Sequence, residues 1–328
     1  MQSTRIGNAL PQWLYRSTFK GLAPRAHPTV TRTKRLYVVA ALLLGCIGSA
    51  VAQQPVFQLW PGGAPGSEKR HGEPEKLTDG AYVSNVHDPS LTVLRADPRH
   101  ANGVAMVVVP GGGHRMLVFQ NEGMVAGRLL NRMGVTAFVL KYRLARDPDS
   151  AGYSIEGDGA ADLRRAVRWV RAHAGEYGID PQRVGIMGFS AGGELVSLVA
   201  DNPEPAQRGK ADALDRQSAR PDFQVLVYPG PQGSPAKSVD GAPPAFLVAG
   251  SRDTCCMPPT LTLYQQLVKA GVSAELHLYA DTDHAFNVGQ RGERISLQHW
   301  PDRLADWLVD GGWLMPRNGR KPEGVPAP

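Results

Sequence analysis

The stretch that decides the fold is Val184-Gly-Ile-Met-Gly-Phe-Ser-Ala-Gly-Gly-Glu-Leu-Val-Ser-Leu-Val-Ala200, in which an apolar run meets a serine between glycines. The run before the serine is typical of a buried strand, and the apolar segment Glu194–Ala200 is typical of a helix. The motif Gly188-Phe-Ser-Ala-Gly192 therefore stands at a strand-to-helix turn, which exposes the Ser190 hydroxyl at the carboxyl end of the strand. This placement predicts a nucleophilic serine.

A serine hydroxyl is a poor nucleophile at neutral pH unless a neighbouring base takes its proton. Where such a turn carries the nucleophile, an acid and then a histidine follow it along the chain. Asp253 comes shortly after the predicted strand Ala245–Ala249. His284 comes shortly after the predicted strand Glu275–Tyr279. The sequence therefore predicts that Ser190, Asp253 and His284 meet at one edge of a sheet as a catalytic set.

Other groups near these positions are less well placed. Asp281 and Asp283 flank His284, and they are too close to it in sequence to orient its ring. The adjacent pair Cys255-Cys256 stands at no strand-to-helix turn, which makes it a poor alternative nucleophile. Neighbouring cysteines cannot cross-link distant parts of a fold. The sequence leaves open whether they are free thiols or a vicinal disulfide.

A glycine run provides candidates for stabilising negative charge. Pro110-Gly-Gly-Gly-His114 follows the predicted strand Val104–Val109, and glycines let backbone amides approach a ligand closely. We expect these amides and the first amide of the helix after Ser190 to form an oxyanion hole. The expected residues are Gly112, Gly113 (or Gly111) and Ala191 for the oxyanion hole, and His114, Phe189 and Glu194 for substrate binding.

Apolar runs and helical patterns alternate along the rest of the chain. The predicted strands are Val104–Val109, Val135–Leu140, Arg183–Met187, Phe223–Tyr228, Ala245–Ala249 and Glu275–Tyr279. The predicted helices include Val125–Met133, Leu163–Ala174, Leu263–Val268 and Pro301–Leu308. Such alternation is typical of a mostly parallel sheet with helices on both faces. We therefore expect one α/β domain over residues 53–312. Its first part, up to about Thr92, should be an extended entry segment, and residues 313–328 should form a disordered tail.

Residues 1–52 differ in composition from the rest of the chain. They hold seven of the 36 basic residues and none of the 30 acidic ones, so the chain is nearly neutral from Gln53 onward. This balance argues against a nucleic-acid partner. The basic pair Lys34-Arg35, the apolar run Leu36–Ala52 and its small-residue end are typical of a secretory signal cleaved after Ala52. We expect a periplasmic or secreted protein, with an uncleaved anchor or a lipid anchor at Cys46 as alternatives.

From about Phe57 to Leu314 the sequence resembles bacterial α/β-hydrolases that are often labelled acetyl-xylan esterase or xylanase and are related to feruloyl esterase-like domains. The motifs that carry the resemblance are Leu59-Trp-Pro-Gly62, Pro89-Ser-Leu-Thr-Val93, Val109-Pro-Gly-Gly-Gly113, Leu140-Lys-Tyr-Arg-Leu144, Tyr177-Gly-Ile-Asp-Pro181 and Pro243-Pro-Ala-Phe-Leu247. The resemblance implies an α/β-hydrolase fold, and a serine esterase acting on acylated sugars or small esters. A xylanase would need a carboxylate pair across the glycosidic bond, for which the sequence offers no candidates.

Two departures from the family pattern lie near the expected pocket. Glu194 stands where the family usually has a histidine, and Cys255-Cys256-Met-Pro258 replaces an apolar stretch. The transfer of substrate from the family is therefore weaker than the transfer of the catalytic set.

The sequence thus predicts a secreted serine carboxylesterase that uses no metal or cofactor. Its expected partner is a small-molecule or carbohydrate ester, with O-acetyl groups on xylan or other sugars as the leading substrate. Only 62 residues separate Ser190 from Asp253, which leaves no room for a large cap and favours a short acyl group. Two alternatives remain, a serine peptidase of the prolyl-oligopeptidase type and a non-catalytic binding protein of the same fold.

Overall fold

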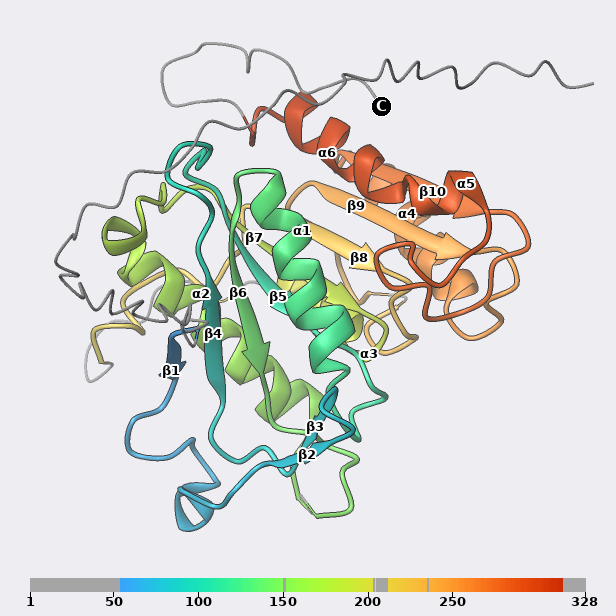
Figure 1. Ribbon diagram of the computed structural model, residues 1–328. Coiled ribbons are helices and arrows are strands. Elements are labelled where there is room, and N and C mark those ends of the chain that lie inside the picture. The colour runs from blue at the N-terminus through green and yellow to red at the C-terminus, as the bar shows by residue number, and fades with distance from the viewer. Residues whose placement is uncertain (1–53, 150–151, 203, 205–211, 235, 315–328) are drawn as a thin grey trace, which may run out of the picture. The chain divides into compact units, whose positions relative to one another are not determined.

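The centre of the structure is a mostly parallel sheet of eight strands (Figure 1). This computed structural model describes residues 54–149, 152–202, 204, 212–234 and 236–314. The described residues belong to one compact unit. The predicted signal, its cleavage site after Ala52 and Cys46 lie outside the described residues.

Six consecutive strands of the sheet run parallel to one another, in the order β6-β5-β7-β8-β9-β10. Their bounds are Ala105–Val109 for β5, Thr136–Lys141 for β6, Val184–Phe189 for β7, Phe223–Val227 for β8, Ala245–Gly250 for β9 and Ala274–Tyr279 for β10. All six predicted strands are confirmed, with bounds that shift by one or two residues. Their carboxyl ends share one edge of the sheet, where parallel sheets of this kind carry their sites.

Two further strands extend the sheet beyond β6. They are β4 (Ser90–Leu94), which is antiparallel to β6, and β1 (Val56–Gln58), which is antiparallel to β4. A separate hairpin pairs β2 (Lys76–Thr78) with β3 (Tyr82–Ser84). The expectation of an extended segment up to Thr92 therefore missed these strands. The reason is that hydroxyl side chains interrupt the apolar pattern of β4, although every residue of β4 is buried.

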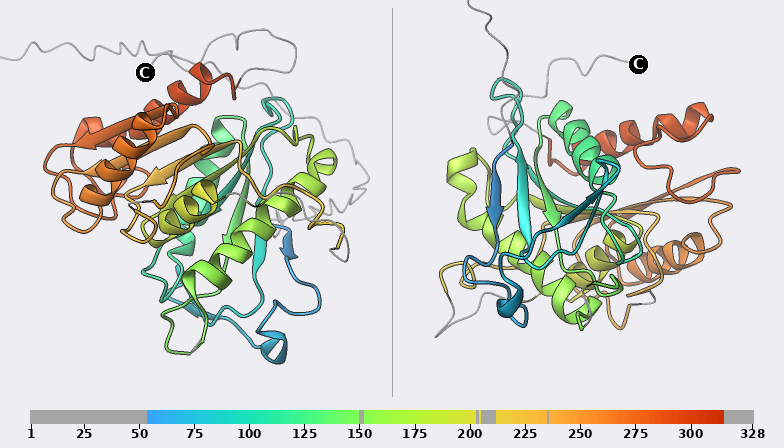
Figure 2. Two further views of the ribbon diagram at one scale, coloured as in Figure 1. Left: turned by 180° about the vertical axis from the view of Figure 1, so that it is seen from behind. Right: turned by 60° about the horizontal axis from the view of Figure 1, so that its bottom comes forward.

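Helices cover both faces of the sheet (Figures 1 and 2). On one face, α1 (Ala126–Arg132) and α6 (Trp300–Asp310) pack on an apolar cluster with the short α5 (Ile295–Gln298). On the other face, α2 (Ala160–Ala172), α3 (Ala191–Asp201) and α4 (Met257–Lys269) pack on a second cluster. Each predicted helix is confirmed. Since both faces are covered, the central strands lack the in–out alternation of a half-exposed sheet.

Short non-α helical segments fill several loops. They are η1 (Glu68–Arg70), η2 (Phe119–Val125), η3 (Ile155–Gly159) and η4 (Ala174–Tyr177), of which η2 and η3 are π-helical. The η2 segment leads from the glycine run into α1, so it lies at the carboxyl edge of the sheet. Within the described residues no helix is both long and apolar enough to cross a bilayer.

The packed body continues two residues past the predicted boundary at residue 312. The Trp313 ring lies 4.7 Å from the Phe223 ring, and Leu314 is buried in the same cluster. The rest of the predicted tail, residues 315–328, lies outside the described residues.

A buried ion pair fastens the N-terminal segment to the sheet. Arg143 donates through Nη2 to Asp162 Oδ1 at 2.8 Å and through Nε to Asp162 Oδ2 at 3.0 Å. The indole of Trp60 donates to the same carboxylate at 3.1 Å. The sequence motifs around Trp60 and Arg143 thus meet on one acceptor in α2.

Asp201, at the end of α3, is a buried carboxyl whose oxygens have no hydrogen-bond partner among the described residues. Burial raises its pKa to about 7, and the neighbouring Gln224 opposes this rise only in part. The folded state therefore holds this proton more tightly than the unfolded state, whose aspartates titrate near pH 4. Stability from this group is full below about pH 4 and is lost as the pH rises through about 7.

We expect Asp201→Asn to remove this pH dependence. The difference in unfolding free energy between the variant and the wild type should increase by about 2 to 3 kcal/mol from pH 5 to pH 8, in favour of the variant. Urea unfolding of both proteins at each pH measures the difference. A gain that is the same at both pH values would contradict the assignment of the titration to Asp201.

Candidate functional site

The turn between β7 and α3 holds Ser190 in a strained backbone conformation. Its φ of 49° lies in the left-handed region, and its own amide donates to Val227 O at 3.0 Å. A Cβ on Gly188 would lie 2.3 Å from Gly192 O, and a Cβ on Gly192 would lie 2.0 Å from Val109 O. Both glycines are therefore required by the close approach of backbone to backbone.

Ser190, His284 and Asp253 form a continuous chain of hydrogen bonds. The Ser190 Oγ lies 2.8 Å from His284 Nε2, and His284 Nδ1 lies 2.6 Å from Asp253 Oδ2. With the proton of the ring on Nδ1 and donated to Asp253, Nε2 is left to accept the proton of the serine hydroxyl. The structure thus brings together the three side chains that the sequence singled out.

The acid of this chain is buried and the histidine is partly open to solvent. The side chain of Asp253 is 1% exposed and that of His284 is 35% exposed. The second carboxylate oxygen, Oδ1, accepts the Cys256 amide at 3.0 Å. A buried carboxylate held by two donors keeps its orientation, so it can fix the ring of His284 and balance a positive charge on it.

The glycine run lies against the serine turn. A Cβ on Gly111 would lie 2.5 Å from Phe189 O and 2.9 Å from Ser190 Cβ. The Gly111 amide donates to Glu122 Oε2 at 2.8 Å, so this amide is already engaged. Within the described residues the amides of Gly112 and Gly113 have no acceptor. The engagement of Gly111 thus favours Gly113 as the partner of Gly112 in the predicted oxyanion hole.

The third predicted donor is the amide of Ala191. Ala191 is the first residue of α3, after Ser190 at the N-cap position. Amides in the first turn of a helix have no acceptor within that helix, and the helix dipole favours negative charge there. An oxyanion beside Ser190 can therefore accept hydrogen bonds from the Ala191 amide on one side and from amides of the glycine run on the other.

The predicted substrate contacts of three side chains need correction. Phe189 has no exposed surface and packs its ring 6.0 Å from that of Tyr228, within the apolar cluster. His114 and Glu194 are also buried and contact each other, with His114 Nε2 at 2.7 Å from Glu194 Oε2. Glu194 Oε1 also accepts the Gln232 amide at 3.2 Å. These side chains support the glycine run and α3 from inside, because none offers surface to a ligand.

Backbone strain gathers around this site. Of eight non-glycine residues with positive φ among the described residues, six belong to the site and the loops beside it. These six are His114, Ser190, Tyr228, Asp281, Ala285 and Asn287. Strained residues of this kind persist where surrounding contacts hold them, and they cluster at functional sites.

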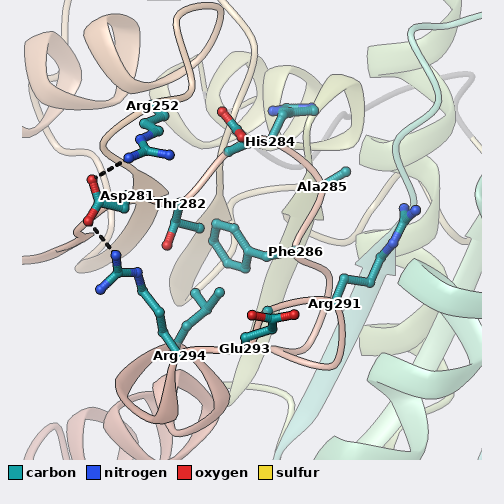
Figure 3. A pocket seen from close by; sticks show the side chains of 12 residues that line it. Arg252, Asp281, Thr282, His284, Ala285, Phe286, Arg291, Glu293 and Arg294 are labelled. Atoms are coloured by element: carbon teal, nitrogen blue, oxygen red, sulfur yellow. Dashed lines mark hydrogen bonds and ion pairs between the residues drawn. The ribbon is translucent and has the colours of Figure 1, made fainter.

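A pocket of about 630 Å³ opens next to His284 (Figure 3). Most of its wall is polar, and Arg252 and Arg294 both reach Asp281 from opposite sides. Ser190 and the glycine run do not line it, so the pocket adjoins the hydrogen-bonded chain only through His284. It can take a part of a ligand that lies away from the reacting bond.

Cys255 and Cys256 are joined by a vicinal disulfide, which answers the question that the sequence left open. Among the described residues, these sulfurs and Asp253 form a candidate metal-ligand set, with ligand atoms within 4.8 Å of one another. The sulfurs are bonded to each other, and both carboxylate oxygens accept hydrogen bonds. The set therefore has no ligand atom to spare in this form of the protein.

The comparisons with known proteins agree with this geometry. Residues 96–227 match the model of the BD-FAE family, a stretch that includes the glycine run and Ser190 and ends before Asp253. This part of the chain is therefore similar to the BD-FAE family.

Curated proteins that are similar to this chain include esterases. The chain is 29% identical over 265 residues to an acetylxylan esterase of Xylanibacter ruminicola, a match that covers 70% of this chain and 48% of that protein. It is 31% identical over 133 residues to an ethyl acetate hydrolase of Pseudomonas putida, covering 40% of this chain and 37% of the relative. The chain thus spans about half the length of the first of these relatives and a smaller share of the second.

Solved structures confirm the α/β-hydrolase fold. The acetyl ester-xyloside bifunctional hydrolase of Caldicellulosiruptor lactoaceticus superimposes with a TM-score of 0.64 at 26% identity, over 80% of this chain and 97% of that one. Propionate-bound esterase 2 of Thermogutta terrifontis does so with a TM-score of 0.60 at 22% identity, over 81% and 97% of the two chains.

Sequence reasoning missed a buried polar group beneath the site. Glu122 accepts the Gly111 amide and, at 3.0 Å, the Tyr228 hydroxyl. Burial raises the pKa of the Glu122 carboxyl, and these two hydrogen bonds act in the opposite direction. Tyr228 ends the predicted strand Phe223–Tyr228 at the carboxyl edge, a position that could have marked it. No sequence pattern marked Glu122.

We expect a fluorophosphonate probe to label Ser190 alone. The Oγ should displace fluoride and form an ester with the phosphorus, because His284 takes the hydroxyl proton. Ser190→Ala should remove the label, and His284→Ala should slow labelling by about 10² or more. Intact mass and peptide mapping measure both effects.

The cysteine pair provides the matched control for this labelling. Cys255→Ser/Cys256→Ser should be labelled at a rate close to that of the wild type, since the contact to Asp253 comes from the Cys256 backbone amide. A label on a cysteine, or loss of labelling in a folded double variant, would show that the sulfurs take part.

Proposed function

We propose that the protein is a serine carboxylesterase that hydrolyses short-acyl esters, with O-acetyl groups on xylan or other sugars as its substrate class. The observation that carries the proposal is the hydrogen-bonded chain from Ser190 through His284 to Asp253. A serine in this environment is activated for acyl transfer, and neighbouring amides without acceptors suit the charge that acyl transfer develops.

Acylation comes first in the proposed reaction. His284 Nε2 takes the proton of Ser190 as Oγ attacks the ester carbonyl carbon. The carbonyl oxygen becomes an oxyanion, which the amides of Gly112, Gly113 and Ala191 stabilise. His284 then gives its proton to the alkoxide of the alcohol, so the alcohol leaves and an acyl-serine remains.

Hydrolysis of the acyl-serine repeats these steps with water. His284 removes a proton from water, the hydroxide adds to the acyl carbon, and the same amides hold the second oxyanion. Collapse releases the carboxylic acid and returns the proton to Ser190 Oγ. The Asp253 carboxylate, hydrogen-bonded to His284 Nδ1, stabilises the imidazolium that forms in each half-reaction. Every step uses groups of this chain and water.

Two observations support acylated sugars as the substrate class. Relatives of this chain are named for acetylxylan and for acetyl ester and xyloside hydrolysis. The pocket beside His284 is lined by charged and hydroxyl side chains, among them Arg252, Thr282, Asp283 and Glu293. A polar wall of this kind suits the hydroxyl groups of a sugar, as the alcohol part of an ester, better than it suits a long alkyl chain.

The short chain between the nucleophile and the acid supports a small acyl group. Between α3 and β9, the described residues form β8 and loops, with no helix among them. A cap domain that would enclose a long acyl chain therefore has little chain from which to be built. Acetyl and other short groups need no such enclosure.

We expect p-nitrophenyl acetate to be hydrolysed at least about tenfold more efficiently than p-nitrophenyl octanoate. Ser190→Ala should lower kcat by at least about 10⁴-fold. Ser197→Ala, which alters a buried serine in the same helix, should leave kcat within about twofold. Acetate release from acetylated xylo-oligosaccharides, followed by NMR, tests the sugar part of the proposal.

Each other outcome favours a different function. Hydrolysis that survives Ser190→Ala would exclude the proposed nucleophile. Cleavage of prolyl peptides by the wild type, without turnover of any ester, would favour the peptidase alternative. Binding of acetylated sugars without turnover would favour a non-catalytic binding protein.

Export of the protein is a further part of the proposal. The basic pair and the apolar run that precede Gln53 are typical of a secretory signal. Acylated xylan is a polymer too large to cross a membrane intact, so an enzyme acting on it is useful outside the cytoplasm. A soluble product after cleavage and a lipid anchor at Cys46 are the two forms that an experiment must separate.

We expect the mature protein to begin at Gln53. Expression of the full chain in a bacterial host, followed by N-terminal sequencing of the periplasmic fraction, measures this. A chain that begins at Cys46 and carries lipid would instead indicate the lipoprotein form. A chain that retains residues 1–52 in the membrane would contradict cleavage.

A further inference from the structure

We propose that Glu122 is a positioning residue that holds the oxyanion hole and the base His284 in register with each other. The inference rests on the proposed function and adds to it a residue outside the catalytic chain. Glu122 lies in the π-helical segment η2, directly after the glycine run. Segments of this kind recur at functional sites, where they bring a side chain into a position that a regular helix does not offer.

The first arm of this network ends at the oxyanion hole. Glu122 Oε2 accepts the Gly111 amide at 2.8 Å, and the same oxygen would lie 2.9 Å from a Cβ on Gly111. Gly111 is pressed against the serine turn and is followed directly by Gly112. The hydrogen bond from the Gly111 amide to Glu122 therefore restrains the backbone segment that carries the Gly112 amide, a predicted oxyanion-hole donor.

The second arm ends at the base. Glu122 Oε1 accepts the Tyr228 hydroxyl at 3.0 Å, and this hydroxyl accepts the Asn287 amide at 3.1 Å. The Tyr228 ring lies edge-on to the His284 ring, with centroids 4.8 Å apart. Tyr228 and Asn287 both have positive φ. The loop that carries His284 is thus held from below by Tyr228, and Tyr228 is held by Glu122.

The two arms start from different oxygens of one carboxylate, and this arrangement makes Glu122 the link. The network joins three connections: the one between β5 and α1, which holds Gly111 and Glu122, the one after β8, which holds Tyr228, and the one after β10, which holds Asn287. All of its polar atoms are buried, where a donor that loses its acceptor is costly. A side chain that accepts only one of the two donors must release the other, and the loop attached to that donor is then free to shift.

The test compares Glu122→Gln, Glu122→Ala and Tyr228→Phe in ester hydrolysis. The amide of Glu122→Gln has one accepting oxygen for two donors, so we expect kcat to fall roughly tenfold. Glu122→Ala removes both acceptors, and kcat should fall roughly 100-fold. KM should change less than threefold in each, because Glu122 is buried behind the loops and does not reach solvent. Fluorophosphonate labelling of Ser190 should slow in the same order.

A double variant distinguishes positioning from general loss of stability. Glu122→Gln/Tyr228→Phe should be no more than about threefold slower than the slower single variant, because both changes break the same connection. Asp201→Asn is the matched control, since it also neutralises a buried carboxyl and leaves the site untouched. Its kcat should equal that of the wild type.

The inference fails if Glu122→Gln and Tyr228→Phe are folded and have the kcat of the wild type. It also fails if their effects multiply in the double variant, since independent effects exclude one shared network. A Glu122 variant that does not fold leaves Tyr228→Phe as a separate test of the second arm. The proposed function fails by a different result, activity that survives Ser190→Ala.

Discussion

The site depends on one constraint, the close approach of three backbone segments where no Cβ fits. The end of β5, the glycine run after it and the turn between β7 and α3 touch through backbone atoms. A Cβ on Gly192 would meet Val109 O at 2.0 Å, and a Cβ on Gly111 would meet Phe189 O at 2.5 Å. Glycine at these positions lets the amides of the run lie beside Ser190. Without this approach Ser190 and the amides of the glycine run would belong to separate loops with no fixed relation.

Sheet topology provides the other half of the site. Since β7, β8, β9 and β10 are neighbours and parallel, the loops that follow β9 and β10 open at the edge where Ser190 stands. Asp253 and His284 need only short loops to reach it. The glycine contacts thus place Ser190, and the strand order places His284 and Asp253, so two independent features of the fold converge on one hydrogen-bonded chain.

The sequence predicted what depends on local pattern and strand order. Ser190, Asp253 and His284 were predictable because each follows a recognisable strand, and the order of parallel strands puts them at one edge. Strand β4 was missed because Ser90 and Thr92 interrupt its apolar pattern, while burial is decided by neighbours distant in sequence. Glu122 could not be found by pattern either, since its role comes from Tyr228, over 100 residues away.

Glu194 stands where the resembled family usually has a histidine, and its contact with His114 offers a physical explanation for a carboxyl side chain at this position. The two side chains contact each other inside the domain, so a carboxylate at position 194 is paired with the residue that ends the glycine run. A lone charge there would be costly to bury, whereas a hydrogen-bonded pair ties α3 to the glycine run. Glu194 therefore belongs to the scaffold of the site and not to its surface. Under the proposed function, selection among esters is left to exposed side chains, and Arg252, Asp283 and Glu293, which line the pocket beside His284, are placed to contact the alcohol part of an ester.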